Sequence, residues 1–227
     1  MNAGDSSSTR LLQHGRITLA LHQLGSASAS AARPLLILHD LGGSSPINVP
    51  PEFGVWEGAI YALDFTGHGQ SSVPRGGGYT AEVLMADVDA ALAEIGSATV
   101  YGRGLGGYVA LLIAGARPSL IHGAIIDDGV GLAGGGTTVH SVHLEFAAAA
   151  IGILATPDPY ALLELSTDVR PTDYAVSFVQ AAVQGSTANP AVAVVASARP
   201  LWLVSVLEQY GAEAMTLPEA LASYLSR

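Results

Sequence analysis

The chain has 227 residues, 49% of them hydrophobic and 12% charged, which is enough to bury the core of a single domain. Nine Arg, no Lys and nineteen Asp or Glu residues give a net charge of -10, which repels phosphate backbones and excludes nucleic acid as an expected partner. The lack of Cys excludes disulfides, thiolate metal sites and a Cys nucleophile. Since no stretch reaches the roughly 18 apolar residues that span a bilayer, we expect a soluble, cytoplasmic protein without a membrane partner.

Short apolar runs, bounded by Gly or Asp, recur through the first 130 residues. Residues 10–24 predict an antiparallel pair of strands that reverses near His14 and Gly15. Four further runs have the continuous apolar character of strands buried on both faces. They lie at residues 34–38, 59–63, 98–101 and 123–126.

Helical patterns lie between the later strands. Residues 79–95 place apolar side chains at close to a 3.6-residue period, with Thr80 as N-cap, and residues 106–117 predict a second helix. Strands that alternate with helices at this spacing predict parallel pairing through right-handed crossovers. We therefore expect an α/β fold with a doubly wound, mostly parallel sheet and helices on both faces.

Residues 132–196 break this alternation and predict a helical lid inserted into the core. They contain an Ala-rich stretch at residues 146–155 and two helical patterns, at residues 159–165 and 174–183. The predicted core accordingly consists of residues 10–131 and 197–227.

The apolar run at residues 200–206 predicts a return to the sheet, and residues 217–225 predict a closing helix that begins near Pro218. As a sheet edge, the strand at residues 200–206 would leave its amides and carbonyls unpaired. We expect this edge either to be covered by the closing helix or to pair with a second copy in a homodimer.

Three segments together resemble the α/β-hydrolase superfamily over roughly residues 10–130. They are LHDLGGS at residues 38–44, DFTGHGQS at residues 64–71 and GRGLGGY at residues 102–108. The resemblance implies an oxyanion-hole loop in the first segment, a structural turn in the second and a nucleophile elbow in the third. In the first two, His39 and His68 belong to local turns.

The elbow lacks its nucleophile. In the family pattern G-x-S-x-G the central Ser stands on a sharp strand-to-helix turn. Here Gly104 takes that place between Gly102 and Gly106, so the turn is kept and the oxygen is lost. Glycine adopts strained turns without a Cβ penalty. The resemblance is therefore to a degenerate member, a pseudoenzyme.

The other triad partners must follow the elbow, with the acid after a late strand and the His after the last one. No His follows His143, and the resemblance implies one more strand than the chain provides before Arg227, so we expect the last strand to be missing. The acid position falls near Glu208, or at Asp128, and either side chain can equally be a solvated carboxylate. We expect serine hydrolase activity to be absent or very weak.

The pocket of the elbow can still bind a ligand. The resemblance implies that the amides of Leu41 and Leu105 point at one site, which favours the carbonyl or carboxylate oxygen of a small molecule. Arg103 is either an anion clamp or a side chain turned outward or paired with a carboxylate. Asp40, where the family has Gly, either lines this site or is a turn residue. A protein partner is the other expected kind of ligand.

An active enzyme is the alternative. His140 and His143 are three residues apart, share a helix face, and with Asp128 can form a displaced acid–base pair for hydrolysis or proton transfer. We expect no metal, since these histidines have no identifiable third ligand. We expect no cofactor, because GLAGGG at residues 131–136 lacks the Lys-Ser/Thr that follows a phosphate-binding loop.

Overall fold

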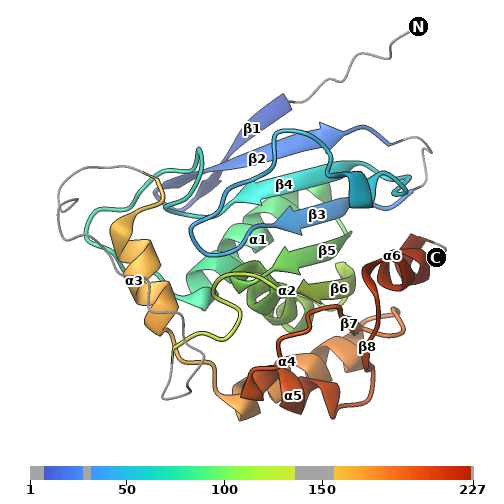
Figure 1. Ribbon diagram of the computed structural model, residues 1–227. Coiled ribbons are helices and arrows are strands. Elements are labelled where there is room, and N and C mark those ends of the chain that lie inside the picture. Colours follow the sequence, from blue (N-terminus) through green and yellow to red (C-terminus); the bar gives the residue numbers. More distant parts are fainter. Residues whose placement is uncertain (1–7, 28–31, 136–155, 226–227) are drawn as a thin grey trace, which may run out of the picture.

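The computed structural model describes residues 8–27, 32–135 and 156–225. Within these ranges eight strands form one mixed sheet of order β1-β2-β4-β3-β5-β6-β7-β8 (Figure 1). β1 (Ser8–His14) pairs antiparallel with β2 (Ile17–Gly25), and β2 pairs antiparallel with β4 (Ile60–Asp64). All other neighbours pair in parallel. The doubly wound, mostly parallel α/β sheet is confirmed.

The other elements of the first 130 residues also follow the predicted order. They are β3 (Leu35–Leu38), α1 (Ala81–Ile95), β5 (Ala98–Arg103), α2 (Leu105–Ala116) and β6 (Ile121–Asp127). The predicted N-cap is confirmed, because the side chain of Thr80 accepts a hydrogen bond from the Val83 N–H.

The core forms two layers, one on each face of the sheet. On one face Leu36 and Val100 pack under α1 and α2, and α4 (Thr172–Gly185) and α5 (Leu201–Leu207) continue this layer. On the other face Leu35 and Tyr101 pack under α6 (Leu217–Leu225) and the short 3-10 helix η1 (Pro51–Phe53). Successive strand residues therefore point to opposite layers, which explains the continuous apolar runs of the sequence.

The strand predicted at residues 200–206 is wrong, because this segment forms α5. Pro200 precedes the helix in the N-cap position, and Trp202, Leu203 and Val206 are buried at the spacing of one helical face. Leu201 and Val204 are exposed. A short, uniformly apolar run fits a buried strand and a buried helix equally well, so its period did not separate the two.

The expectation of a missing last strand is also wrong. β7 (Val192–Val194) and β8 (Ala212–Ala214) complete the parallel part of the sheet, and each has only three residues. β7 lies within residues 132–196, which we assigned to the lid, but it pairs with β6 in the core sheet. Because β8 forms this edge of the sheet, the homodimer expected through residues 200–206 loses its structural basis.

The predicted lid contributes two described helices. α3 (Pro159–Thr167) buries Ala161 and Leu165 against the first core layer near the carboxyl ends of the strands, whereas α4 packs on α2. Residues 136–155, including the Ala-rich stretch, lie outside the described residues. In the part of the chain that the structure describes, no helix is long and apolar enough to cross a membrane.

Candidate functional site

Gly104 forms the expected sharp turn between β5 and α2. Its φ of 56° and ψ of -118° lie where L side chains are rarely found. The Gly104 N–H donates to the Asp127 carbonyl at 3.0 Å, and the Gly104 carbonyl accepts from the Gly107 N–H at 3.0 Å. The local backbone is therefore that of a strand-turn-helix elbow, with glycine at its apex.

The space beside this apex is filled by backbone. A Cβ atom added at Gly104 would lie 2.3 Å from the Val130 carbonyl oxygen and 2.6 Å from the carbonyl carbon of Gly129. Neither atom belongs to a flexible side chain that can turn away. The chain that follows β6 thus occupies the volume that the side chain of a nucleophile would need.

The same segment also occupies the two amides of the predicted oxyanion hole. The Leu41 N–H donates to the Val130 carbonyl oxygen at 3.1 Å, and the Leu105 N–H donates to the same oxygen at 3.0 Å. The two amides therefore do point at one site that favours a carbonyl oxygen. That oxygen comes from the chain itself.

Asp128 lies at the carboxyl end of β6, as one of the two predicted acid positions requires. Its carboxylate accepts the Ser197 N–H at 2.6 Å and the Ala198 N–H at 2.9 Å. The neighbouring Asp127 accepts the hydroxyl of Tyr101 at 2.6 Å. Burial, and then this hydrogen bond, raise the pKa of Tyr101. Both carboxylates thus hold loops and strands together.

Glu208, the other predicted acid, is the exposed C-cap residue of α5. It does not follow a strand, because the run before it is helical. His140 and His143 lie outside the described residues, so the structure does not show whether they approach Asp128.

Arg103 and Asp40 form an ion pair with each other. The Arg103 Nε lies 3.8 Å from Asp40 Oδ2 and donates to the Asp128 carbonyl at 3.2 Å, and its side chain is 61% exposed. Asp40 Oδ2 also accepts the Val130 N–H at 3.4 Å. Of the two readings of Arg103, the geometry favours the outward, paired one. The pair fastens the segment that fills the oxyanion hole.

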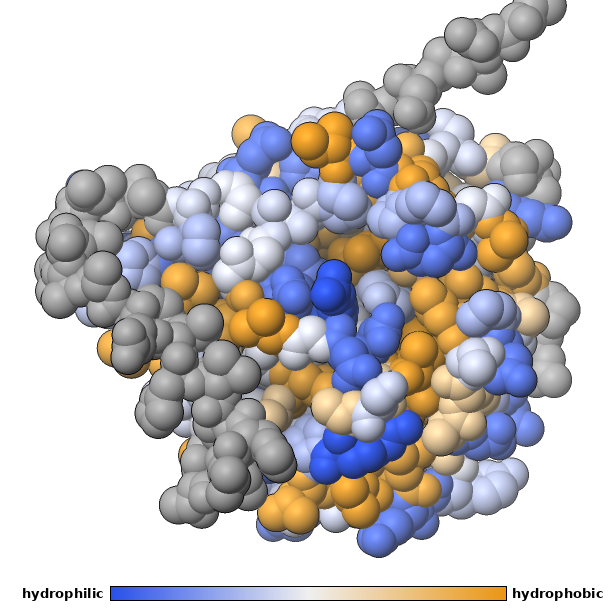
Figure 2. All heavy atoms as spheres, in the orientation of Figure 1, coloured by the Kyte–Doolittle hydropathy of each residue, from blue (hydrophilic) through white to orange (hydrophobic). Residues whose placement is uncertain are grey.

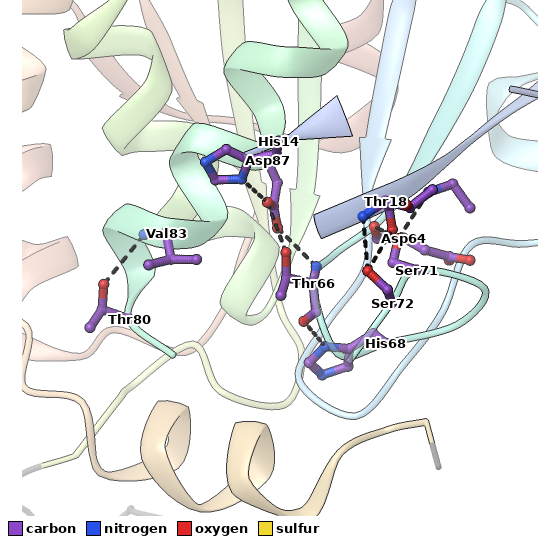
Figure 3. Close-up of polar contacts among 11 residues, drawn as sticks. His14, Thr18, Asp64, Thr66, His68, Ser71, Ser72, Thr80, Val83 and Asp87 are labelled. Atoms are coloured by element: carbon purple, nitrogen blue, oxygen red, sulfur yellow. Dashed lines mark hydrogen bonds and ion pairs between the residues drawn. The ribbon is translucent and has the colours of Figure 1, made fainter. Parts of the chain in front are cut away.

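The rings of His39 and His68 serve local hydrogen bonds, as the family turn implies. His68 Nε2 accepts the Gly42 N–H at 3.3 Å, so its Nδ1–H donates to the Thr66 carbonyl at 3.1 Å (Figure 3). Burial, and then the nearby His39, lower the pKa of His68 to about 4. Burial also lowers the pKa of His39, whose Nε2 accepts the Phe65 N–H. Both rings are neutral at pH 7.

Sequence reasoning missed a group of hydrogen-bonded polar side chains around Asp64, at the carboxyl end of β4. Asp64 is almost fully buried and accepts the N–H groups of Ser45 and Gln70, each at 2.7 Å. His22 Nε2 lies 3.0 Å from Asp64, and His22 Nδ1 lies 2.9 Å from Thr9 Oγ1. These contacts depend on the β1–β2–β4 register, which no local sequence signal discloses. Among the described residues, no group of three His, Asp or Glu side chains is placed to hold a metal ion.

Comparisons with known proteins identify the fold. No protein-family model matches the chain, and no curated protein sequence matches it. A loop variant of the haloalkane dehalogenase DbeA from Bradyrhizobium elkanii superposes with a TM-score of 0.62 and 18% identity, covering 93% of this chain and 89% of that chain. The thioesterase domain from the curacin biosynthetic pathway gives 0.60 and 14%, covering 97% and 98%.

Another match is shorter. The chain spans 39% of epoxide hydrolase A from Mycobacterium thermoresistibile, where 53% of this chain is covered at 22% identity and a TM-score of 0.45. The two longer superpositions show that the chain has the α/β-hydrolase fold. At such low identities they show the fold alone.

Proposed function

We propose that this α/β-hydrolase-fold protein is a non-catalytic binding module in which structural contacts replace the catalytic machinery of the fold. One observation carries the proposal: the Val130 carbonyl oxygen accepts the N–H groups of both Leu41 and Leu105. In an acyl-transfer enzyme such amides must be free to stabilise the oxyanion of the transition state. Here a backbone carbonyl uses them in the folded protein.

The surroundings of Gly104 support the same proposal. A nucleophile needs an oxygen or sulfur atom at the apex of the elbow and space for it to reach a substrate carbonyl. Gly104 has no side chain, and the backbone of residues 129–130 fills the adjacent volume. Without a nucleophile and with its donors occupied, the site lacks two separate requirements for acyl transfer.

A small molecule remains the proposed ligand of this site. Val130 is 40% exposed and lies between two glycines, Gly129 and Gly131. The carbonyl or carboxylate oxygen of a ligand can replace the Val130 carbonyl and preserve both hydrogen bonds to the amides. Such a ligand would have to break the hydrogen bonds that Val130 makes within the chain, so its affinity should be modest.

A small ligand is favoured over a protein partner. On the face drawn in Figure 2, described hydrophilic and hydrophobic residues are interspersed and do not form one broad apolar area. A stable protein interface usually has an apolar centre surrounded by a polar rim.

An enzyme that uses His140 or His143 with Asp128 is not favoured. Both carboxylate oxygens of Asp128 already accept backbone N–H groups, from Ser197 and Ala198. These two bonds give Asp128 a structural role in holding the loop after β7, which an acid–base role does not require.

The test is a panel of activated esters at neutral pH, with heat-denatured protein as the reference. We expect no turnover above the reference. His122→Asn, at the other end of the strands, is the control. If the protein turns over an ester, and if His140→Ala or His143→Ala abolishes this turnover while His122→Asn keeps it, the protein is an enzyme that uses these histidines and the proposal is wrong.

Ligand binding is tested separately, through the amide resonances of Leu41 and Leu105. A short-chain carboxylate or ester should shift both resonances together and to saturation. If both amides keep their shifts at every concentration of each compound, the elbow is not the binding site.

A further inference from the structure

A cavity of about 230 Å³ lies at the amino ends of the parallel strands. The elbow follows the carboxyl end of β5, so the two sites lie at opposite edges of one sheet. Figure 1 shows α6, which forms one wall of this cavity, on the other side of the view from α3. The lining residues are Arg33, His122, Thr187, Ala188, Asn189, Ser223 and Tyr224.

The lining has basic and neutral side chains, and these described residues include no Asp or Glu. This is unusual for a chain of net charge -10 with only nine Arg residues. Arg33 comes from the segment before β3 and His122 from the start of β6. β5 alone separates these two strands in the sheet, so both residues reach the same cavity. The cavity is therefore a local positive region on an acidic protein.

Among residues 8–27, 32–135 and 156–225, the polar ends of these two side chains have no hydrogen-bond or ion-pair partner. In the described part of the chain, hydrogen bonds of Arg33 and His122 involve their backbone carbonyls, which accept from Trp56 Nε1–H and from the Thr99 hydroxyl. No ion pair there engages the Arg33 guanidinium. Up to five guanidinium N–H groups are thus available for an acceptor.

No carboxylate among the lining residues neutralises the charge of Arg33. Burial lowers the pKa of Arg33, and burial followed by the charge of Arg33 lowers the pKa of His122. The Tyr224 hydroxyl donates to the Pro190 carbonyl, and burial, followed by the charge of Glu213 on β8, raises the pKa of Tyr224. The positive charge of the cavity therefore lacks a compensating anion among its lining residues.

We propose that this cavity binds a small anion through its phosphate or carboxylate group, with Arg33 as the cationic contact and His122 and Asn189 as further donors. Arg presents paired N–H groups that match the oxygens of either group. The volume is below the roughly 300–1,000 Å³ of pockets for drug-sized ligands, which favours a small metabolite over a nucleotide cofactor. This proposal does not depend on the proposed function of the elbow.

The experiment follows the His122 imidazole by NMR in the full chain, titrated with inorganic phosphate and, separately, with acetate at constant ionic strength. The His122 resonance is assigned by its absence from His122→Asn. We expect a saturable shift and a rise in the pKa of His122, because the anion offsets the charge of Arg33. The tighter of the two anions identifies the chemical class of the ligand.

Two variants separate a site from a general charge effect. Arg33→Gln should weaken binding about tenfold or more, through loss of a charge-assisted contact. Arg16→Gln removes an exposed charge from the β1–β2 turn and should leave binding unchanged. If Arg33→Gln does not fold, His122→Asn, observed through the amides of residues 187–189, takes its place.

Shifts that grow linearly with both anions, without saturation, would overturn the proposal. Equal weakening in Arg33→Gln and Arg16→Gln would also overturn it. Neither result bears on the ester panel, which probes the opposite edge of the sheet, so failure of one proposal is distinguishable from failure of the other.

Discussion

The two edges of the parallel sheet differ in whether their polar groups have partners. At the carboxyl edge, the Leu41 and Leu105 amides bind the Val130 carbonyl, and Asp128 binds two amides of the loop after β7. At the amino edge, the side chains of Arg33 and His122 line a cavity without a carboxylate in its lining. The groups at the positions of the elbow and of one predicted acid thus make structural hydrogen bonds, whereas the donors proposed to bind an anion lie where no sequence motif marked them.

The largest expected effect is that of Gly104→Ser. A side chain there meets both an unfavourable φ and the backbone of residues 129–130, so we expect a loss of about 3 to 5 kcal/mol in the free energy of unfolding. Urea unfolding measures it. We also expect almost no gain in ester hydrolysis, because a neutral hydroxyl without a general base is a poor nucleophile.

Gly96→Ser is the matched control for Gly104→Ser. Gly96 also has a positive φ, of 79°, but a Cβ atom there would meet nothing within 4 Å. The free energy of unfolding of Gly96→Ser should fall only by the cost of a positive φ in a residue with a side chain, about 1 kcal/mol or somewhat more. Equal losses in both variants would show that residues 129–130 move aside easily. A gain in hydrolysis on the order of a hundredfold would instead place a histidine, His140 or His143, beside the elbow.

The neutral histidines of the carboxyl edge predict a second effect, on acid stability. The pKa of His68 is about 4 in the folded protein and about 6.5 when unfolded, so the unfolded state binds more protons between these values. Stability is therefore full above pH 6.5 and falls as the pH drops towards 4, by about 3 kcal/mol for His68 alone. Burial of His39 acts in the same direction.

Urea unfolding at a series of pH values measures this loss. His68→Gln cannot take up a proton, so its stability should fall less steeply across the same window, although it starts lower. If the variant and the parent chain lose the same free energy between pH 6.5 and pH 4, His68 is not a source of the acid sensitivity.

A smaller effect distinguishes the two carboxylates that were predicted as catalytic acids. Asp128→Ala frees the amides of Ser197 and Ala198, which are exposed enough for water to replace part of the loss, so we expect about 1 to 2 kcal/mol. Glu208→Ala, at an exposed helix end, should cost less than about 0.5 kcal/mol. Amide exchange at Ser197 and Ala198 should speed up only in Asp128→Ala. Equal exchange rates at Ser197 and Ala198 in both variants would show that Asp128 does not hold these amides.

The sequence predicted the part of the fold where local patterns and spatial neighbours coincide. The strands and α-helices predicted up to residue 127 have either a helical period or apolar runs between Gly and Asp, and all of them form in the structure, whereas the short η1 was not predicted. In the carboxyl-terminal part the helices predicted at residues 159–165, 174–183 and 217–225 form as α3, α4 and α6. The prediction missed β7 and β8 because each has only three residues, and it assigned α5 as a strand because α5 is apolar at most positions. At that length, tertiary pairing and not local period decides the structure.

The sequence predicted the elbow turn at Gly104 but not the Val130 carbonyl that binds the Leu41 and Leu105 amides. The glycines at 102, 104 and 106 indicate the elbow, since each is a position of close backbone approach. The contact between Val130 and the two amides joins backbone atoms far apart in sequence, and any residue type supplies a carbonyl oxygen. Likewise, Arg33 and His122 meet only through the strand order β3-β5-β6, which spacing alone does not give.

The smallest expected effect concerns Arg33 and bears directly on the contrast between the two edges. If its guanidinium has no structural partner, Arg33→Gln should change the free energy of unfolding by less than about 0.5 kcal/mol in chloride buffer, as should Arg16→Gln. Inorganic phosphate should then raise the melting temperature of the parent chain and of Arg16→Gln, because a ligand that binds only the folded state stabilises it. Arg33→Gln should not respond. A large loss of stability for Arg33→Gln in chloride would instead mean that its donors are already engaged, and the amino edge would then resemble the carboxyl edge.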